Sequence, residues 1–194
     1  SDSTKPQRLH RARLLALINS LLDVSRIDQG RAVEEPVLVD MTSVIQEAIV
    51  SLTGEAKQRG IELTFAVPKK ALPQVRVTRG HMFEAIENLV SNALRYSQEQ
   101  GGVTITLCVR ERMLEIRVSD TGIGIPQTDQ AKIFSKFFRA SNAVRSFTDG
   151  SGLGLSVVKS YVEENGGNVS FESQENVGTT FLIRLPIPEE SRED

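Results

Sequence analysis

The chain of 194 residues is 39% hydrophobic and 25% charged, with a formal net charge of −2 at pH 7, which fits one globular domain with an appendage and gives no sign of a nucleic-acid partner. Its single cysteine, Cys108, and its two histidines, His10 and His81, exclude a disulfide scaffold and a metal site built from cysteines or several histidines. No run of about 18 apolar residues could span a membrane, and the scarcity of cysteine favours a reducing, cytoplasmic compartment.

Residues 7–29 carry the first strong pattern, a stripe of leucines at the alternating three-four spacing of a helix bundle. Gly30 is expected to end this helix. A single helix this apolar cannot bury itself, so we expect its partner helix to precede Ser1 or to come from a second copy of the chain.

After a linker at 31–36, the pattern predicts strands at 37–39, 61–67, 75–77, 103–109, 114–118, 169–173 and 180–185. It predicts longer helices at 42–59, 84–97 and from 150–155 to Asn165, a short helix at 127–136, a mobile loop at 140–151 and a disordered charged tail at 189–194. Strands in hairpins with three longer helices indicate an α+β fold, in which the helices cover one face of a mixed, largely antiparallel sheet.

The predicted helix at 84–97 has two faces. One is apolar, and it contains Ala85, Ile86, Leu89, Val90, Ala93 and Leu94 at helical spacing. The other carries Asn88 and Asn92 four residues apart, with Arg95 one turn further on. Asparagine is a poor helix former because its amide competes for backbone hydrogen bonds. This polar face is either an ordinary solvated surface or a binding surface, and the segment alone leaves both open.

Two glycine-rich turns follow this helix. The first, D-T-G-I-G-I-P at 120–126, comes after a strand, and the second, G-S-G-L-G-L at 150–155, opens a helix whose backbone N–H groups could attract phosphate. The first turn does not match the Rossmann fingerprint, and the chain has no P-loop string. Taken alone, the first is a tight turn and the second a hinge. Lys136, Arg139 and Arg145 lie between them, so this segment could also form a lid over an anionic ligand.

Five motifs, in order, resemble the N, first glycine, F, second glycine and third glycine boxes of bacterial sensor histidine kinases. They are E-N-L-V-S-N-A-L-R-Y-S from position 87, D-T-G-I-G-I-P from 120, F-S-K-F-F-R from 134, G-S-G-L-G-L from 150 and G-T-T-F from 178. Residues 1–33 resemble the second helix of that family's dimerisation and phosphotransfer hairpin, and residues 34–188 resemble its catalytic domain. The resemblance implies a two-layer α/β sandwich that binds ATP, a fold shared with gyrase, mismatch-repair and heat-shock chaperone ATPases.

The resemblance also implies roles for the polar helix face. Asn92 would bind Mg²⁺, which prefers oxygen ligands in an octahedron and keeps several waters. Asn88 would support the same site, and Arg95 would pair with a phosphate where the family often has lysine. Tyr96 would pack beside the nucleotide. Together with Arg139, the two asparagines and Arg95 would be the catalytic residues.

The glycine boxes would surround the rest of the nucleotide. Asp120 would accept a hydrogen bond from the adenine amino group, and either Thr179 or Thr180 would line the adenine pocket. Arg139 and a lid at 140–155 would close on the γ-phosphate. The other residues implied to contact ATP are Gly122, Ile123, Gly124, Lys136, Gly150, Gly152, Leu153, Gly154 and Leu155.

The chain departs from the family at its histidines. The sequence after His10 does not match the acceptor-histidine box, and His81 stands where the family usually has arginine, so we interpret His10 as a surface residue and His81 as a structural or solvent-facing one. Asn165 replaces the histidine of the family's H-G-G string. The predicted reaction is therefore transfer of the γ-phosphoryl group of Mg-ATP to a histidine outside this chain, in the cytoplasmic part of a sensor that dimerises through its bundle helix and signals to a response regulator. Any membrane contact would come from upstream segments.

Two rival functions remain. A conformational ATPase of the same fold would have a general-base glutamate four residues before the Mg²⁺-binding asparagine, but that position is Asn88, and Glu84 and Glu87 are in the wrong register. A pseudokinase would bind nucleotide, or none, and would act through dimer contacts; the intact set of glycine boxes argues against it.

Overall fold

A computed structural model of the chain describes residues 35–147 and 150–189. The predicted bundle helix, His10 and most of the charged tail lie outside the described residues, and the proposed boundary between residues 33 and 34 stays a prediction.

Five strands form the central sheet, in the order β2-β4-β5-β7-β6. Their bounds are Glu62–Ala66 (β2), Gly102–Arg110 (β4), Met113–Asp120 (β5), Asn168–Gln174 (β6) and Gly178–Pro186 (β7). Strand β2 runs parallel to β4, and the other neighbours are antiparallel. A separate antiparallel pair joins β1 (Val37–Val39) to β3 (Val75–Val77). The predicted mixed, largely antiparallel sheet is confirmed.

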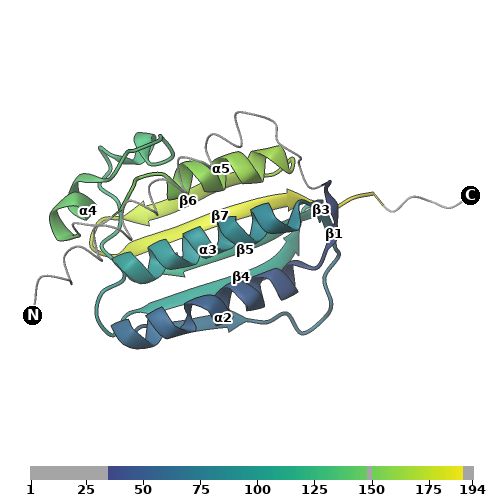
Figure 1. Ribbon diagram of the computed structural model, residues 1–194, viewed down its shortest axis with the longest axis horizontal. Coiled ribbons are helices and arrows are strands. Elements are labelled where there is room, and N and C mark those ends of the chain that lie inside the picture. Colours follow the sequence, from purple (N-terminus) through teal and green to yellow (C-terminus); the bar gives the residue numbers. More distant parts are fainter. Residues whose placement is uncertain (1–34, 148–149, 190–194) are drawn as a thin grey trace, which may run out of the picture. The chain divides into compact units, whose positions relative to one another are not determined.

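Three helices lie on one face of this sheet: α2 (Met41–Arg59), α3 (Arg79–Tyr96) and α5 (Gly154–Glu164) (Figure 1). Helix α2 begins where Asp40 Oδ1 accepts a hydrogen bond from Thr42 N at 2.9 Å, and it ends at Gly60, whose φ of 64° is left-handed. These caps are visible in the sequence, which explains why the bounds of α2 are predicted within a residue, whereas α3 begins at Arg79, five residues before the predicted start at 84.

The core lies between the helices and the sheet. Alternate residues of the central strands point toward the helices and are buried, among them Leu114, Ile116, Val118, Phe181, Ile183 and Leu185. The apolar face of α3 meets them with Met82, Ala85, Ile86, Leu89, Val90, Ala93 and Leu94, all buried. Burial of a side chain of this size contributes about 1.5–3 kcal/mol, so the apolar face holds α3 in place and leaves its polar face to one side.

The other face of the sheet is polar and fixes the register of β5 against β7. Glu115 is only 2% exposed, and its carboxylate accepts hydrogen bonds from Arg184 Nε at 2.9 Å and from Arg117 Nη2 at 3.0 Å. Burial acts to raise the pKa of Glu115, but the two arginines outweigh it and lower that pKa. Because Glu115 lies opposite Arg184, Asp120 at the end of β5 lies opposite Thr179 at the start of β7.

Two predictions between the glycine turns are wrong. The helix predicted at 127–136 is reduced to one 3₁₀ turn, Gln130–Lys132, because Ile133 is buried and Phe134 packs against Phe171 and Phe181. The loop predicted at 140–151 contains a short helix, α4 (Ser141–Ser146). In both places tertiary contacts decide the local structure, and the local composition does not reveal them.

Candidate functional site

The polar face of α3 meets the first turn of α5. Asn88 Nδ2 donates to the Glu84 carbonyl oxygen at 3.0 Å, so its Oδ1 points the other way. A Cβ placed on Gly154 would lie 3.0 Å from Asn88 Oδ1 and 3.8 Å from Asn92 Nδ2. The two amides therefore face the start of α5, and glycine at position 154 leaves room beside them.

Two arginines from different segments converge next to these amides. A Cβ placed on Gly150 would lie 3.3 Å from Arg95 Nη1 and 3.4 Å from Arg139 Nε. Arg139 Nη2 donates to the carbonyl oxygens of Phe147 at 2.7 Å and Ala143 at 3.3 Å, whereas its Nε is buried without a hydrogen-bond partner among the described residues. Two neighbouring guanidinium groups, one with an unsatisfied buried donor, form a natural binding place for an anion.

Tyr96 lies beside this cluster at the end of α3. Its ring meets the ring of Phe147 edge to face, with centroids 5.2 Å apart. The prediction for Tyr96 did not include Phe147, which carries no sequence signal of its own within a polar stretch.

Asp120 lies at the end of β5 and is partly buried. Its Oδ1 accepts hydrogen bonds from Gly122 N at 2.9 Å and from Thr179 N at 3.2 Å. Burial raises the pKa of Asp120 to about 6, and the two backbone hydrogen bonds offset only part of that shift. Because Oδ1 takes both backbone donors, Oδ2 is the oxygen that remains for a ligand.

The strand register separates Thr179 from Thr180. Thr179 lies opposite Asp120, on the face of the sheet that the helices cover, and it is buried. Thr180 lies on the other face, where its hydroxyl donates to Ser119 Oγ at 2.9 Å. Of the two threonines, only Thr179 is on the side of Asp120.

The first glycine turn brings backbone close to α3 and to the β6–β7 turn. A Cβ on Gly122 would lie 2.4 Å from the Tyr96 carbonyl oxygen, and one on Gly124, whose φ is 62°, would lie 2.0 Å from the Gln174 carbonyl oxygen. Ile123 N donates to the same Tyr96 oxygen at 3.0 Å. No side chain larger than hydrogen fits at either glycine without a backbone shift.

A buried asparagine that the sequence did not single out ties α4 to this turn. Asn142 Nδ2 donates to the carbonyl oxygens of Gly124 at 2.9 Å and Ile123 at 3.3 Å. At the start of α4, Ser141 N donates to Asp129 Oδ2 at 2.7 Å, which lowers the pKa of Asp129. A lone asparagine in a polar segment has no periodicity to mark it, so only the fold reveals this contact.

The structure does not gather every predicted residue. Lys136 is exposed, and among the described residues no polar contact ties it to the others. Leu153 is 1% exposed and belongs to the core, while Gly152 packs against the backbone of Phe137 and Phe138. Leu155 follows in the first turn of α5 and is partly exposed.

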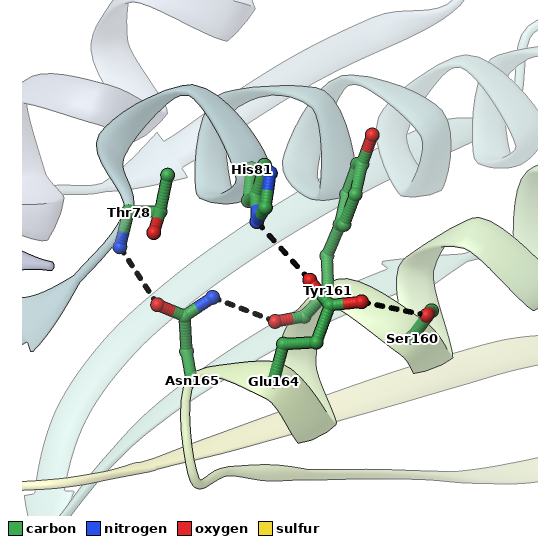
Figure 2. Close-up of polar contacts among 6 residues, drawn as sticks. All are labelled: Thr78, His81, Ser160, Tyr161, Glu164 and Asn165. Carbon is green, nitrogen blue, oxygen red and sulfur yellow. Dashed lines mark hydrogen bonds and ion pairs between the residues drawn. The ribbon is translucent and has the colours of Figure 1, made fainter. Parts of the chain in front are cut away.

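His81 and Asn165 lie at the other end of α3, as Figure 2 shows. The imidazole of His81 stacks on Tyr161 with ring centroids 4.1 Å apart, and its Nδ1 is 3.4 Å from Glu164 Oε2. Eleven residues of helix separate His81 from Asn92, roughly 16 Å. The histidine is therefore a structural residue at the α3–α5 contact, in agreement with the structural reading of the sequence.

The side chains present could hold a magnesium ion only together with other ligands, namely water molecules and substrate phosphates. Among the described residues there is no group of three or more histidine, cysteine, aspartate or glutamate side chains that could hold a metal. The amides of Asn88 and Asn92 offer neutral oxygens, which suit a cation that keeps its waters and is also bound by substrate phosphates. No helix in the described part of the chain is long and apolar enough to cross a membrane.

Comparison with known proteins agrees with this geometry. A family model described as histidine kinase-, DNA gyrase B-, and HSP90-like ATPase matches residues 78–189. The chain is 34% identical over 179 residues to the signal transduction histidine-protein kinase BarA of Escherichia coli (strain K12), covering 90% of this chain and 19% of BarA. It is 33% identical over 184 residues to the sensor histidine kinase WalK of Bacillus subtilis (strain 168), covering 94% and 30%. The chain thus spans less than a third of either relative.

Solved structures show the same fold. Full-length ShkA in complex with AMPPNP superposes with a TM-score of 0.75 at 29% identity, covering 89% of this chain and 35% of that one. The catalytic domain of histidine kinase ThkA superposes with a TM-score of 0.69 at 28% identity, covering 79% of this chain and 97% of that one. The chain belongs to the family of histidine kinase-, DNA gyrase B-, and HSP90-like ATPases, and it contains the ATP-binding catalytic domain of a bacterial sensor histidine kinase.

Proposed function

We propose that this domain transfers the γ-phosphoryl group of Mg-ATP to a histidine on another helix, as the cytoplasmic catalytic part of a two-component sensor. The phosphoryl group then passes to an aspartate-bearing response regulator, and the full-length protein dimerises through its bundle helices. Support comes from the relatives, which are named as histidine kinases, and from the chemistry of the site.

The observation that carries this proposal is the convergence of an anion-binding and an adenine-binding feature at one end of the domain. One side of the domain brings together the last residues of α3 and β5, the first residues of β7 and α5, and helix α4 (Figure 1). Arg95 and Arg139 supply positive charge near Gly150, and Asp120 supplies a carboxylate oxygen at the end of β5. A nucleotide triphosphate has both a hydrogen-bond donor on its base and a polyanion, so one ligand can use both features.

In this proposal each side chain orients the substrate or neutralises charge. Asp120 Oδ2 accepts from the adenine amino group, while Thr179 borders the same pocket. Asn92, with Asn88 beside it, would hold Mg²⁺, which would supply positive charge that offsets the charge of the phosphates. Arg95 and Arg139 bind the phosphates, with the unsatisfied Nε of Arg139 gaining a partner. Phosphoryl transfer needs this positioning and charge more than it needs covalent chemistry from the protein.

The site also explains why transfer is favoured over hydrolysis. A hydrolase needs a base to activate water, and the position four residues before Asn92 is Asn88, an amide engaged with its own helix. Glu87 points toward α2, where its Oε1 accepts a hydrogen bond from Ser51 Oγ at 3.0 Å. His81 is not a candidate acceptor, because its ring is stacked on Tyr161 at the far end of α3.

A reconstitution tests the reaction. The chain is mixed with Mg-ATP labelled on the γ-phosphate and with a separate helical hairpin that carries the acceptor histidine of its own full-length protein. We expect an acid-labile, base-stable phosphohistidine on the hairpin. Nucleotide binding without phosphohistidine would instead indicate a pseudokinase, and steady phosphate release without the hairpin would indicate a conformational ATPase.

Replacing Asn92 tests the proposed magnesium ligand. Asn92→Ala removes the amide oxygen while leaving the buried face of α3 intact, so we expect the Mg²⁺-dependent part of ATP affinity to disappear and phosphotransfer to fall at least a hundredfold. Titration calorimetry with and without Mg²⁺ measures the first effect. The matched control is Asn168→Ala, at an exposed position of β6. If the Asn92 variant retains wild-type Mg²⁺ dependence, Asn92 is not the ligand.

A further inference from the structure

The segment between the two glycine turns contains a chain of hydrogen bonds that links the first glycine turn to Arg139. Asn142 Nδ2 donates to Gly124 O at 2.9 Å, and Asn142 Oδ1 accepts from Ala143 N at 2.8 Å. The carbonyl oxygen of Ala143 in turn accepts from Arg139 Nη2 at 3.3 Å. The bonds connect, through the backbone of Ala143, the first glycine turn to the guanidinium group of Arg139.

Each end of this chain of bonds reaches a different part of the proposed nucleotide site. Gly124 belongs to the turn that follows Asp120, where the adenine is proposed to bind. Arg139 lies beside Arg95 at Gly150, where the phosphates are proposed to bind. Among the described residues, Asn142 is the one side chain that joins α4 to the first glycine turn by hydrogen bonds.

Asn142 is also too well buried to be a passive surface residue. It is 9% exposed, and a buried amide costs free energy unless its donors and acceptor are satisfied. All three of its hydrogen bonds go to the backbone. The two to the carbonyl oxygens of Ile123 and Gly124 depend on one relative placement of α4 and the turn, whereas the third, from Ala143 N, lies within α4. An aspartate of similar shape could keep the bond from Ala143 N but could not donate to the two carbonyl oxygens.

We propose that Asn142 is a positioning residue that sets Arg139 against the γ-phosphate by tying α4 to the first glycine turn. This inference rests on the proposed function, in which Arg139 contacts the phosphates. The chain of hydrogen bonds makes the placement of Arg139 depend on the turn that contacts the adenine end. Loss of Asn142 should therefore weaken the discrimination between ATP and ADP more than it weakens binding of adenosine or ADP.

The experiment measures the dissociation constants of ADP and of a non-hydrolysable ATP analogue, both with Mg²⁺, for the whole chain. The proteins are wild type, Asn142→Ala, Arg139→Ala, the double variant and the control Asn168→Ala. We expect Asn142→Ala to reduce the preference for the ATP analogue over ADP by about three- to tenfold, the effect of one or two hydrogen bonds. ADP affinity should change less than twofold, and the double variant should show the same preference as Arg139→Ala alone because the two residues act in series.

Several outcomes would overturn the inference. Asn142→Ala could lose equal affinity for both nucleotides, or it could keep the wild-type preference for the ATP analogue. The double variant could also lose more of that preference than Arg139→Ala alone. Each of these results would show that Asn142 does not act through Arg139. If Asn142→Ala fails to fold, Asn142→Asp provides the same comparison, and an unchanged preference in that variant would count against the proposal. A wild-type chain that binds neither nucleotide would refute the proposed function instead.

Discussion

The two ends of the α3–α5 contact are built from similar residues and do different things. At the far end, Asn165 accepts a hydrogen bond from Thr78 N at 2.7 Å and donates to Tyr161 O at 2.7 Å. It thereby joins the start of α3 to the end of α5 (Figure 2). At the near end, the amides of Asn88 and Asn92 face the first turn of α5.

The polar groups at the two ends differ, and this difference distinguishes a structural contact from a ligand-binding site. Asn165 is 8% exposed, with both atoms of its amide engaged with backbone. The near end combines an unsatisfied Arg139 Nε, paired positive charges and a carboxylate whose pKa is raised to about 6. At the far end His81 Nδ1 also lacks a hydrogen bond within the described part of the chain, but it has Glu164 Oε2 at 3.4 Å as an ion-pair partner. The buried donor of Arg139 and the raised pKa of Asp120 mark the near end as the site that a ligand completes.

Asp120→Asn should have the largest effect among the variants that break this comparison. Asparagine keeps an oxygen for Gly122 N and Thr179 N, but it can place an amino group where Oδ2 meets the adenine. A hydrogen bond to a charged group contributes about 1.5–3 kcal/mol, so we expect ATP affinity to fall by roughly ten- to a hundredfold with little change in melting temperature. Calorimetric titration with ATP and with GTP measures it. If Asp120→Asn retains wild-type ATP affinity, the adenine is bound elsewhere.

Asn165→Ala should give the opposite result, a loss of stability without a loss of affinity. The change removes two buried hydrogen bonds and takes the Asn165 acceptor away from Thr78 N, which should lower the free energy of unfolding by about 1–3 kcal/mol. Urea denaturation measures this value, and Asn168→Ala is again the exposed control.

The affinity of Asn165→Ala is then measured at a temperature where the variant is fully folded. We expect the dissociation constant for ATP to stay within twofold of wild type. A larger change would mean that the far end transmits its state along the helices to the site, and the two ends would no longer count as independent.

The pKa of Asp120 predicts a pH dependence that sharpens the contrast. Burial raises this pKa above its ordinary 3.8 to about 6. The charged carboxylate therefore lowers the free energy of unfolding at higher pH, and this penalty is relieved as the pH falls through 6. A donor from adenine favours the charged form, and binding below pH 6 must therefore release a proton. We expect ATP affinity to drop about tenfold between pH 7 and pH 5.

Calorimetry in two buffers with different ionisation enthalpies measures this proton release. The phosphates of ATP also titrate in this range, but that contribution is common to wild type and Asp120→Asn, so the difference between the two proteins isolates the carboxyl group. Identical pH profiles for the two proteins would rule out the linkage.

The sequence predicted which candidate site residues lie together where they share one element. Asn88, Asn92 and Arg95 share a face of α3 because helical spacing alone places them there. The caps of α2 could be predicted equally well, since aspartate is favoured at a helix N-cap and glycine at a left-handed C-cap, the positions of Asp40 and Gly60.

Contacts between distant segments could not be predicted in this way. The choice between Thr179 and Thr180 depends on strand register, which the ion pairs of Glu115 fix across 69 residues of chain. The role of Asn142 depends on where α4 lies against a turn 18 residues earlier. The helix predicted at 127–136 failed for the same reason, since the burial of Ile133 and the aromatic contacts of Phe134 override local preference.

The two threonines give the smallest and most local test of that register. Thr179→Val removes a hydroxyl that lies 2.9 Å from Ser173 Oγ on the side of Asp120, and Thr180→Val removes one that donates to Ser119 on the opposite face. Because valine has nearly the same shape as threonine, each change tests the hydroxyl alone. We expect Thr179→Val to weaken ATP binding about three- to tenfold, in line with one neutral hydrogen bond, and Thr180→Val to leave it within twofold. Equal effects, or a larger effect at Thr180, would mean that the nucleotide does not lie on the helix-covered face of the sheet, and the placement of adenine at Asp120 would have to be abandoned with it.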